Sequence, residues 1–316
     1  MKMRAGLLIG LFSVLLGGCK VTVSESYDVS ADPHTFTPGL YLDARDTGEY
    51  FPASSWNLSQ HSDDCIDETL YFETDSGRVR IYGSPAFSDI DFRAAATELE
   101  HSIDSVLSRF QLRWWEFVAD RSAAAPYPRQ ILGCLSPTVS RTEFADASIS
   151  AIGILPHYSQ WPYDTGRIIT HQLTHFVQEN LSRYHSRYSL LPYWFAEGQA
   201  SVVAGENEAS AYQHYDYDPL EDATLLDAGP EDYRFSHYAL AYRYLEEANG
   251  KLAMTILLDL IQLLDWEGGF DGFTGTGETW AFVEAFNAAG LVDHLNQPLT
   301  WQRYKADYHY LLSHSY

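Results

Sequence analysis

The sequence predicts an α+β fold in which a small mixed sheet with a long backing helix precedes a mainly helical C-terminal half. Two short β-prone runs, residues 68–74 and 78–83, flank an Asp-Ser-Gly segment and predict a hairpin. Apolar residues then recur every three or four positions over residues 92–114, as in a helix with one buried face. Helical patterns fill most of the chain after residue 235. Strands first and helices to the end indicate the α+β class.

The first half contains further element signals. Ser88 is suited to cap the long helix, which we expect to back the sheet. Residues 130–135 and 148–155 are apolar runs of strand length. Asp164 or Thr165 can cap the next helix, which we expect to end near residue 182.

Helical signals then continue to the C-terminus. Pro192 fits the first turn of a helix that Gly205 would end. Gly198 inside it would let this helix approach the preceding one closely. The remaining helical patterns cover residues 235–249, 251–264, 278–289 and 299–314.

The chain begins with the pattern of a secretion signal. Lys2 and Arg4 precede an apolar run over residues 7–16, which is too short to span a bilayer as a mature helix. The run Leu-Gly-Gly-Cys ending at Cys19 resembles the lipobox of bacterial lipoproteins, which implies cleavage after residue 18 and a lipid on Cys19. An ordinary secreted protein with an incidental Cys19 is the alternative.

The lipobox resemblance implies a place in the cell. The lipid at Cys19 would attach the protein to a membrane of the bacterial cell envelope. Lys20 stands where an inner-membrane retention signal would place Asp, which favours the outer membrane, facing either the periplasm or the cell surface.

Three segments are expected after the signal peptide of residues 1–18. Residues 19–64 are rich in Ser, Thr, Asp, Pro and Gly without sustained periodicity and predict a lipidated tether with irregular structure. Residues 65–190 would form a β-rich subdomain with the histidine-bearing helix, and residues 191–316 a helical subdomain.

The two cysteines that follow Cys19 predict a disulfide. Cys65 and Cys134 would meet in an oxidising compartment, which predicts one disulfide worth about 4 kcal/mol in the chain-entropy model. Two buried free thiols are the alternative.

The net charge of -23 repels phosphate backbones and anionic headgroups, so no nucleic-acid partner is expected, and membrane attachment must come from the lipid.

A candidate metal site lies in the middle of the chain. His171 and His175 stand four residues apart, so both imidazoles leave one face of a helix, and Glu197 can add a carboxylate from the next helix. Two imidazoles and a carboxylate are typical of a catalytic zinc site with an open position. A core helix with satisfied or exposed histidines is the alternative.

The segments around these residues resemble a known family. HQLTHFVQ from His171 and PYWFAEGQA from Pro192 are similar to HELTHVVQ and P-x-W-hydrophobic-x-E-G-x-A of the gluzincins, the thermolysin-like zinc peptidases, and in particular of their compact, peptidase MA-like bacterial branch. HYALAYRYLEEANG, ETWAFVEAFNAAG and TWQRYKADYHYLL also resemble its later helices. The resemblance runs from about residue 68 to the end and implies a zincin-like domain.

The resemblance also implies site residues. His171, His175 and Glu197 would hold one zinc ion. Ala151, Gly153 and Leu155 would lie in an edge strand that pairs with a bound peptide.

The sequence departs from the family at the general base. The family has Glu after the first His, where this chain has Gln172, and an amide cannot take a proton from a zinc-bound water. Losing general-base catalysis typically costs about 100-fold to 10,000-fold in rate. With Glu197 as the only carboxylate, the metal site would carry one net positive charge, which favours ionisation of the bound water.

Several other residues are weaker candidates. The oxyanion stabiliser would be Tyr238, with His237 and Tyr242 as alternatives on the same helix. His157 is a candidate for substrate contact, and Glu179 could support a metal ligand, although a solvated helix charge is the favoured interpretation. A calcium site is disfavoured because the spacing of the acidic residues lacks a glycine-centred calcium loop; these residues are Asp216, Asp218, Glu221 and Asp222.

The sequence therefore predicts an exported lipoprotein with a gluzincin-like zinc site. It would be a pseudo-peptidase or strongly impaired metallopeptidase that binds a peptide or protein. Two alternatives stay open: an active peptidase that recruits another base, such as Tyr238 or His237, and a structural envelope lipoprotein without metal.

Overall fold

The computed structural model places one compact unit between Thr37 and Tyr316. Within it the structure describes residues 40–43, 70–83, 86–118, 130–135, 143–146, 151–154, 159–160, 163–182, 190–206, 217–220, 231–268 and 279–314. The predicted signal peptide, Cys19, Cys65 and most of the predicted tether lie outside these residues.

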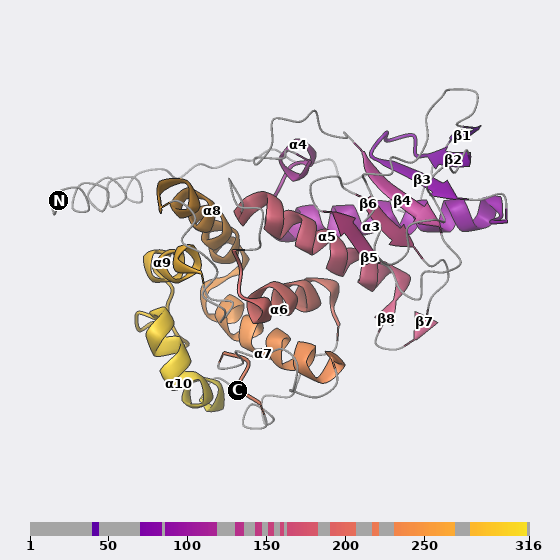
Figure 1. The fold of residues 1–316 in the computed structure, drawn as a ribbon. Helices are drawn as coiled ribbons and strands as arrows, with labels where there is room; N and C mark the ends of the chain where they lie inside the picture. The colour runs from indigo at the N-terminus through magenta and orange to yellow at the C-terminus, as the bar shows by residue number, and fades with distance from the viewer. Residues whose placement is uncertain are drawn as a thin grey trace, which may run out of the picture. The chain divides into compact units, whose positions relative to one another are not determined.

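A mixed six-stranded sheet forms one part of the unit (Figure 1). Its spatial order is β1-β2-β3-β4-β6-β5, with parallel pairing of β3 to β4 and of β4 to β6 and antiparallel pairing elsewhere. The predicted hairpin is confirmed, since Leu70 pairs with Gly83 and Gly77 turns the chain at a φ of 69°. The strands are β1 (Leu40–Asp43), β2 (Leu70–Glu73), β3 (Val79–Gly83), β4 (Ile131–Leu135), β5 (Glu143–Asp146) and β6 (Ala151–Ile154), and β7 (Ser159–Gln160) pairs separately with β8 (Tyr163–Asp164).

Helices make up most of the rest, which confirms the α+β class and the helical second half. Among the described helices, none combines the length and apolar character needed to cross a membrane. The helices are α3 (Asp89–Phe110), α4 (Trp114–Phe117), α5 (Thr165–Ser182), α6 (Tyr193–Ala204), α7 (Glu231–Asn249), α8 (Lys251–Gly268), α9 (Trp280–Ala288) and α10 (Trp301–Ser313).

Helix α3 backs the sheet as predicted. Ser88 caps it in a reciprocal capping box with Asp91, so two backbone donors of the first turn are satisfied. Its apolar face, which includes Phe92 and Leu99, is buried in the same cluster as the sheet residue Ile81. Helix α5 packs beside α3 and itself contacts β5 and β6, whereas α3 contacts β2, β3 and β4.

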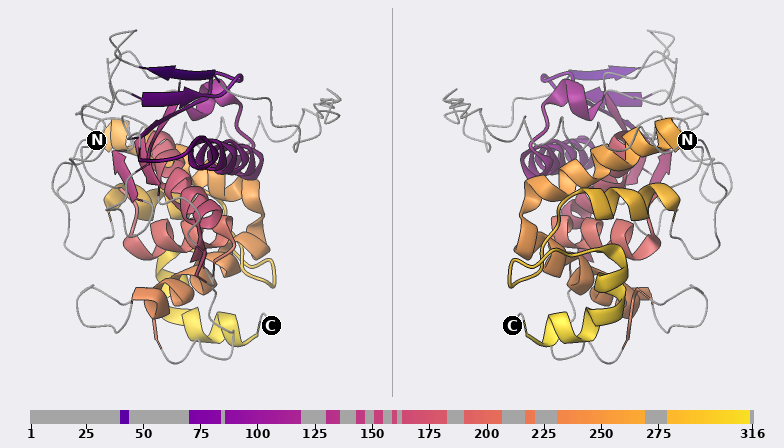
Figure 2. Two further views of the ribbon diagram at one scale, coloured as in Figure 1. Left: turned by 90° about the vertical axis from the view of Figure 1, so that its right-hand side faces the viewer. Right: turned by 90° about the vertical axis from the view of Figure 1, so that its left-hand side faces the viewer.

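Helix α6 packs between α5 and α7 (Figure 2). A Cβ atom on Gly198 would lie only 2.3 Å from the backbone oxygen of Tyr238 in α7. Gly198 therefore permits α6 to approach α7 closely. The prediction that it permits a close approach to α5 was wrong. Pro192 is the N-cap residue rather than part of the first turn, and Gly205 ends α6 with a φ of 67°.

The buried core continues from the sheet into the C-terminal helices. Trp194 of α6 stacks on Trp301 of α10 at 5.8 Å between ring centroids, and Phe282 of α9 packs edge-on against both rings. The two segments predicted as subdomains, residues 65–190 and 191–316, thus share one hydrophobic cluster.

One end of a disulfide lies in β4. Cys134 is disulfide-bonded, and the chain's other cysteines, Cys19 and Cys65, are both outside the described residues. Pairing with Cys65 stays a prediction.

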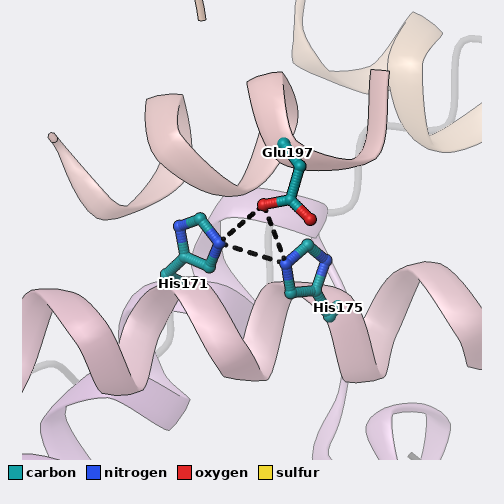
Figure 3. Close-up of side chains that lie close together, drawn as sticks. All are labelled: His171, His175 and Glu197. Carbon is teal, nitrogen blue, oxygen red and sulfur yellow. Dashed lines mark hydrogen bonds and ion pairs between the residues drawn. The ribbon is translucent and has the colours of Figure 1, made fainter. Parts of the chain in front are cut away.

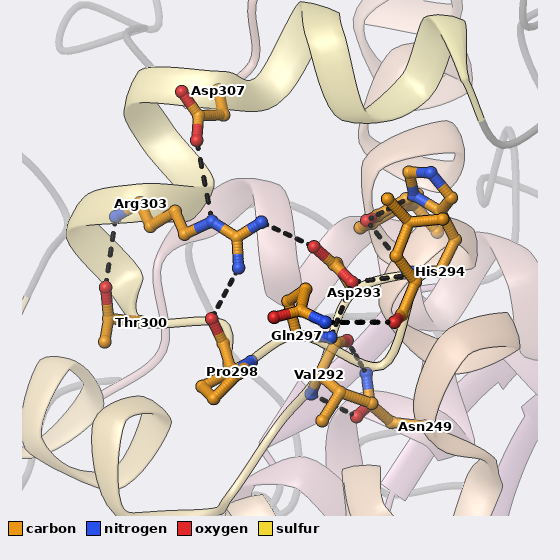
Figure 4. A network of polar contacts seen from close by, with 11 residues as sticks. Asn249, Val292, Asp293, His294, Gln297, Pro298, Thr300, Arg303 and Asp307 are labelled. Carbon is orange, nitrogen blue, oxygen red and sulfur yellow. Dashed lines mark hydrogen bonds and ion pairs between the residues drawn. The ribbon is translucent and has the colours of Figure 1, made fainter.

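A buried carboxylate organises the turn between α9 and α10 (Figure 4). Asp293 is 1% exposed, and its carboxylate accepts hydrogen bonds from the backbone N–H groups of Leu295 and Gln297 and from the guanidinium of Arg303. Burial alone would raise the pKa of Asp293, but the Gln297, Arg303 and Leu295 donors outweigh it and hold that pKa below its usual value.

The first prediction concerns helix packing. We expect Gly198→Ala to lower the free energy of unfolding by about 1–3 kcal/mol or more, because α6 and α7 must separate to admit the methyl group. Gly205→Ala is the matched control: nothing lies within 4 Å of its Cβ position, so only the positive φ opposes the change. Urea unfolding of both variants measures the difference, and equal destabilisation would contradict the packing explanation.

The second prediction concerns Asp293. We expect Asp293→Asn to lower the free energy of unfolding by about 1–3 kcal/mol at pH 7, since the partly buried contact with Arg303 loses the negative charge of residue 293. A lowered carboxyl pKa stabilises the fold above the usual value near 3.9 and stops doing so as the pH falls through the folded-state pKa. The difference between wild type and variant should therefore shrink with acidification. Denaturant titrations from pH 7 to pH 3 test this, and a constant difference would contradict it.

Candidate metal centre

The three predicted ligands come together from α5 and α6 (Figure 3). Helix α5 buries apolar residues such as Leu173 and Val177 in the core, which leaves His171 and His175 on the face toward α6. Glu197 lies within α6, whose ends at Pro192 and Gly205 fix where the helix can sit. Both imidazoles and the carboxylate point toward a common position.

The spacing of the ligand atoms fits one zinc ion. The Nε2 atom of His171 lies 3.1 Å from Oε2 of Glu197 and 3.1 Å from Nε2 of His175, and the latter atom lies 3.5 Å from the same carboxylate oxygen. Tetrahedral zinc with bonds of about 2.0–2.1 Å places its ligand atoms roughly 3.3 Å apart. The donors are those of a catalytic zinc site, and the side chain of His175 is 23% exposed, so the site is not sealed from solvent.

The outer nitrogen of each imidazole has a partner of its own. Nδ1 of His171 lies 3.0 Å from Oε2 of Glu206, and Nδ1 of His175 lies 2.8 Å from Oε1 of Gln178. Such contacts orient metal-binding histidines and fix which nitrogen faces the metal. Glu179 was the acidic residue that the sequence suggested for this role, and Glu206 was not predicted.

Glu206 reaches the site because of the way α6 ends. Gly205 adopts a left-handed conformation, and the N–H of Glu206 donates to the carbonyl of Ser201, so the chain folds back over the last turn. The Glu206 side chain is 5% exposed. The only sequence signal was an acidic residue directly after a helix-ending glycine, and that pattern does not specify which side chain it meets.

The carboxylates beside His171 favour its protonated form. Burial disfavours the charged form of His171, but the charge of Glu206 and the hydrogen bonds to Glu197 and Glu206 outweigh it and raise the pKa of His171 to about 10. Burial likewise opposes ionisation of Glu197, but the neighbouring histidines outweigh it and lower the pKa of that carboxyl. His171 thus lies between two carboxylates that favour its protonated form, and a divalent cation would compete with that proton.

Glu206 also changes the net charge expected for a zinc-bound site. Glu197 alone would leave a zinc site with neutral imidazoles at one net positive charge, whereas Glu206 beside His171 brings the sum to zero. The expected assistance to ionisation of a bound water is correspondingly weaker.

The candidate oxyanion residues lie in an aromatic cluster beside the site. Phe235 stacks on His171 at 6.3 Å between ring centroids, and Tyr238 packs against both Phe235 and Tyr193. The hydroxyl of Tyr238 lies 3.3 Å from that of Tyr217. Its role toward an oxyanion stays a prediction.

The alternative residues on α7 are buried. His237 is fully buried between the rings of Tyr217 and Tyr233. Tyr242 accepts a hydrogen bond from Gln199 inside the protein.

The remaining site predictions fall in several places. Gln172 is half-buried on α5, and its effect on the chemistry stays a prediction. Asp218 caps a turn by accepting from the N–H of Leu220, and its other oxygen lies 3.4 Å from His309. His157, Asp216, Glu221 and Asp222 lie outside the described residues.

The predicted edge strand is wrong. Ala151 pairs with Leu132 on one side and Asp146 on the other, and Gly153 pairs with Cys134 and Glu143, so β6 has no open edge over these residues. Leu155 lies outside the described residues. The outer strand on this side is β5, which the sequence analysis missed because its four residues, EFAD, include no apolar run.

Comparison with known proteins gives no assignment. No protein-family model matches the chain, and no curated protein matches it.

The third prediction concerns Glu206. Because zinc must displace the proton of His171, wild-type affinity should rise about tenfold per pH unit between pH 6 and pH 9, below the pKa of about 10. Glu206→Gln removes the charge that raises this pKa, so we expect the rise to level off at lower pH. At the alkaline end, zinc should bind about 10–100-fold more weakly to the variant.

Chelator competition across this pH range measures both effects. Glu179→Gln removes a charge from the same helix as the histidines and is the control. A Glu206→Gln profile identical to that of wild type would show that this carboxylate does not act on His171.

Proposed function

We propose that the protein is an exported lipoprotein whose gluzincin-like domain holds one zinc ion and binds a peptide or protein, with hydrolysis slow or absent. The observation that carries this proposal is the convergence of His171, His175 and Glu197, with ligand atoms 3.1–3.5 Å apart, next to a base position occupied by Gln172. The lipid at Cys19 would hold the domain at the cell envelope, with the outer membrane favoured.

The chemistry available to the site favours binding. A bound zinc ion would supply a Lewis acid for a carbonyl oxygen. Gln172 can orient a carbonyl or a water through its amide, but it cannot accept a proton. Tyr238 and His237 are buried among aromatic rings, which favours the binding function over a peptidase that recruits either one as base.

An extended peptide would find its backbone partner in β5. Among the described strands, β5 pairs with β6 on one side and is last in the strand order, and it lies next to α5, the helix that carries both histidines. An exposed strand edge binds extended peptides through main-chain hydrogen bonds. The ligand class we propose is therefore an extended peptide segment that crosses β5 toward the metal centre.

The fourth prediction tests the replaced base. We expect purified wild type and Gln172→Glu each to bind one zinc ion, since residue 172 is not a ligand, and His175→Ala to lose it. Restoring a carboxylate should raise zinc-dependent peptide hydrolysis by about 100-fold to 10,000-fold over wild type. Metal analysis and cleavage of an unfolded protein substrate provide the two measurements.

Two outcomes would contradict the proposal. Zinc-dependent cleavage by wild type at the rate of Gln172→Glu would show an active peptidase with another base. Absence of stoichiometric zinc from wild type purified without chelator would favour a structural lipoprotein whose histidines are incidental.

A further inference from the structure

A chain of buried side chains leads from His175 away from the metal position. Oε1 of Gln178 lies 2.8 Å from Nδ1 of His175, and Nε2 of Gln178 lies 2.9 Å from Oε1 of Gln199 in α6. Nε2 of Gln199 in turn lies 2.9 Å from the hydroxyl of Tyr242 in α7. Gln178, Gln199 and Tyr242 are each at most 2% exposed, so water does not compete for these bonds.

A backbone carbonyl fixes the direction of this chain. The amide nitrogen of Gln178 also lies 2.8 Å from the carbonyl oxygen of Ala196, which can only accept a hydrogen bond. That end of the Gln178 side chain must therefore be its NH2 group, and its oxygen must face His175. Since the Gln178 oxygen can only accept, Nδ1 of His175 must donate and carries a hydrogen.

The same logic orients the other end. Gln199 accepts from Gln178 through its oxygen, so its NH2 group donates to the oxygen of Tyr242. The Tyr242 hydroxyl then has its own hydrogen for the carboxylate of Glu246, with which it also interacts. Glu246 is held by an ion pair with Arg109 of α3. The chain thus ends on a buried charge pair, and each of its links joins a donor to an acceptor.

We propose that Gln178, Gln199 and Tyr242 are positioning residues that keep a hydrogen on Nδ1 of His175 and so direct the lone pair of Nε2 toward the metal position. The other tautomer would place an N–H group against the ion and would leave the oxygen of Gln178 without its donor. The consequence for zinc binding rests on the proposed function, whereas the tautomer of His175 does not.

The Glu246–Arg109 ion pair opposes a reversal of the hydrogen-bond directions along Gln178, Gln199 and Tyr242. Turning the Gln199 amide around would set its oxygen against the hydroxyl oxygen of Tyr242 and its NH2 group against that of Gln178. Burial and the charge of Glu246 raise the pKa of Tyr242, so its hydroxyl keeps the proton that it donates. Buried networks of this kind define a unique arrangement only when each member is satisfied.

The fifth prediction compares Gln178→Leu and Tyr242→Phe with Tyr304→Phe. Tyr304 is a matched control, because its buried hydroxyl donates to the carbonyl of Ala241 next to the chain without belonging to it. The first measurement is the ¹⁵N NMR spectrum of the imidazoles in metal-free protein labelled at histidine, with His175 assigned through a His175→Asn variant. We expect hydrogen on Nδ1 of His175 in wild type and in Tyr304→Phe, and a change of tautomer or a mixture in Gln178→Leu.

The second measurement is zinc affinity by chelator competition. We expect Gln178→Leu to bind zinc about 10–100-fold more weakly than wild type, Tyr242→Phe to show a smaller loss, and Tyr304→Phe to show none. Thermal unfolding of the metal-free proteins separates loss of orientation from loss of stability, since Tyr242→Phe removes the buried hydrogen bonds to Gln199 and Glu246 and Tyr304→Phe removes the one to Ala241.

The outcomes distinguish this proposal from the proposed function. Hydrogen on Nε2 of wild-type His175, or an unchanged His175 tautomer in Gln178→Leu, overturns the positioning role whether or not zinc binds. A wild type that has the expected tautomer but does not bind zinc overturns the proposed function and leaves the orientation of His175 established. Equal zinc loss in Tyr242→Phe and Tyr304→Phe would reduce the effect of Tyr242 to general stability and overturn its place in the chain.

Discussion

The position of α6 between α5 and α7 is the constraint on which the candidate site depends. This helix contributes Glu197 to the metal position, Gln199 to the chain behind His175 and, through its last turn, the fold-back that brings Glu206 to His171. All three contacts require α6 to stay in register with α5. Gly198 lets α7 pack closely against α6. Because glycine has no side chain, the backbone of α6 at this point directly contacts the backbone of α7 at Tyr238.

Electrostatics set the second constraint. His171 lies between two nearly buried carboxylates, and their charges favour a proton on His171 by raising its pKa. A divalent cation can replace that proton because it neutralises the same pair of charges. The two histidines are held by opposite means, since a charged Glu206 supports His171 and a neutral Gln178 supports His175.

The sequence was sufficient for the parts that depend on local pattern. Helical periodicity and the caps at Ser88 and Gly205 predicted α3 and the end of α6, and the i, i+4 spacing predicted that both histidines share a face. It was insufficient where tertiary packing decides. β5 is a short strand whose pairing with β6 is invisible in its composition, so the edge was placed one strand too far inward. The contact of Glu206 with His171 depends on the direction that the chain takes after the turn at Gly205. The contact of Gly198 depends on α7, a helix distant in sequence.

Under the proposed function, Gln172 and Glu206 are two departures from a peptidase site that act in the same direction. Gln172 removes the group that would accept a proton, and Glu206 cancels the net positive charge that would otherwise help a metal-bound water to ionise. The groups that hold the metal position are nevertheless fully built, with an outer partner on each imidazole and buried amides that satisfy one another. Burying such groups is costly unless their hydrogen bonds are made. Under the proposed function, a site with this ligand geometry and Gln172 at the base position is suited to holding an ion and a carbonyl group, which is the chemistry of binding.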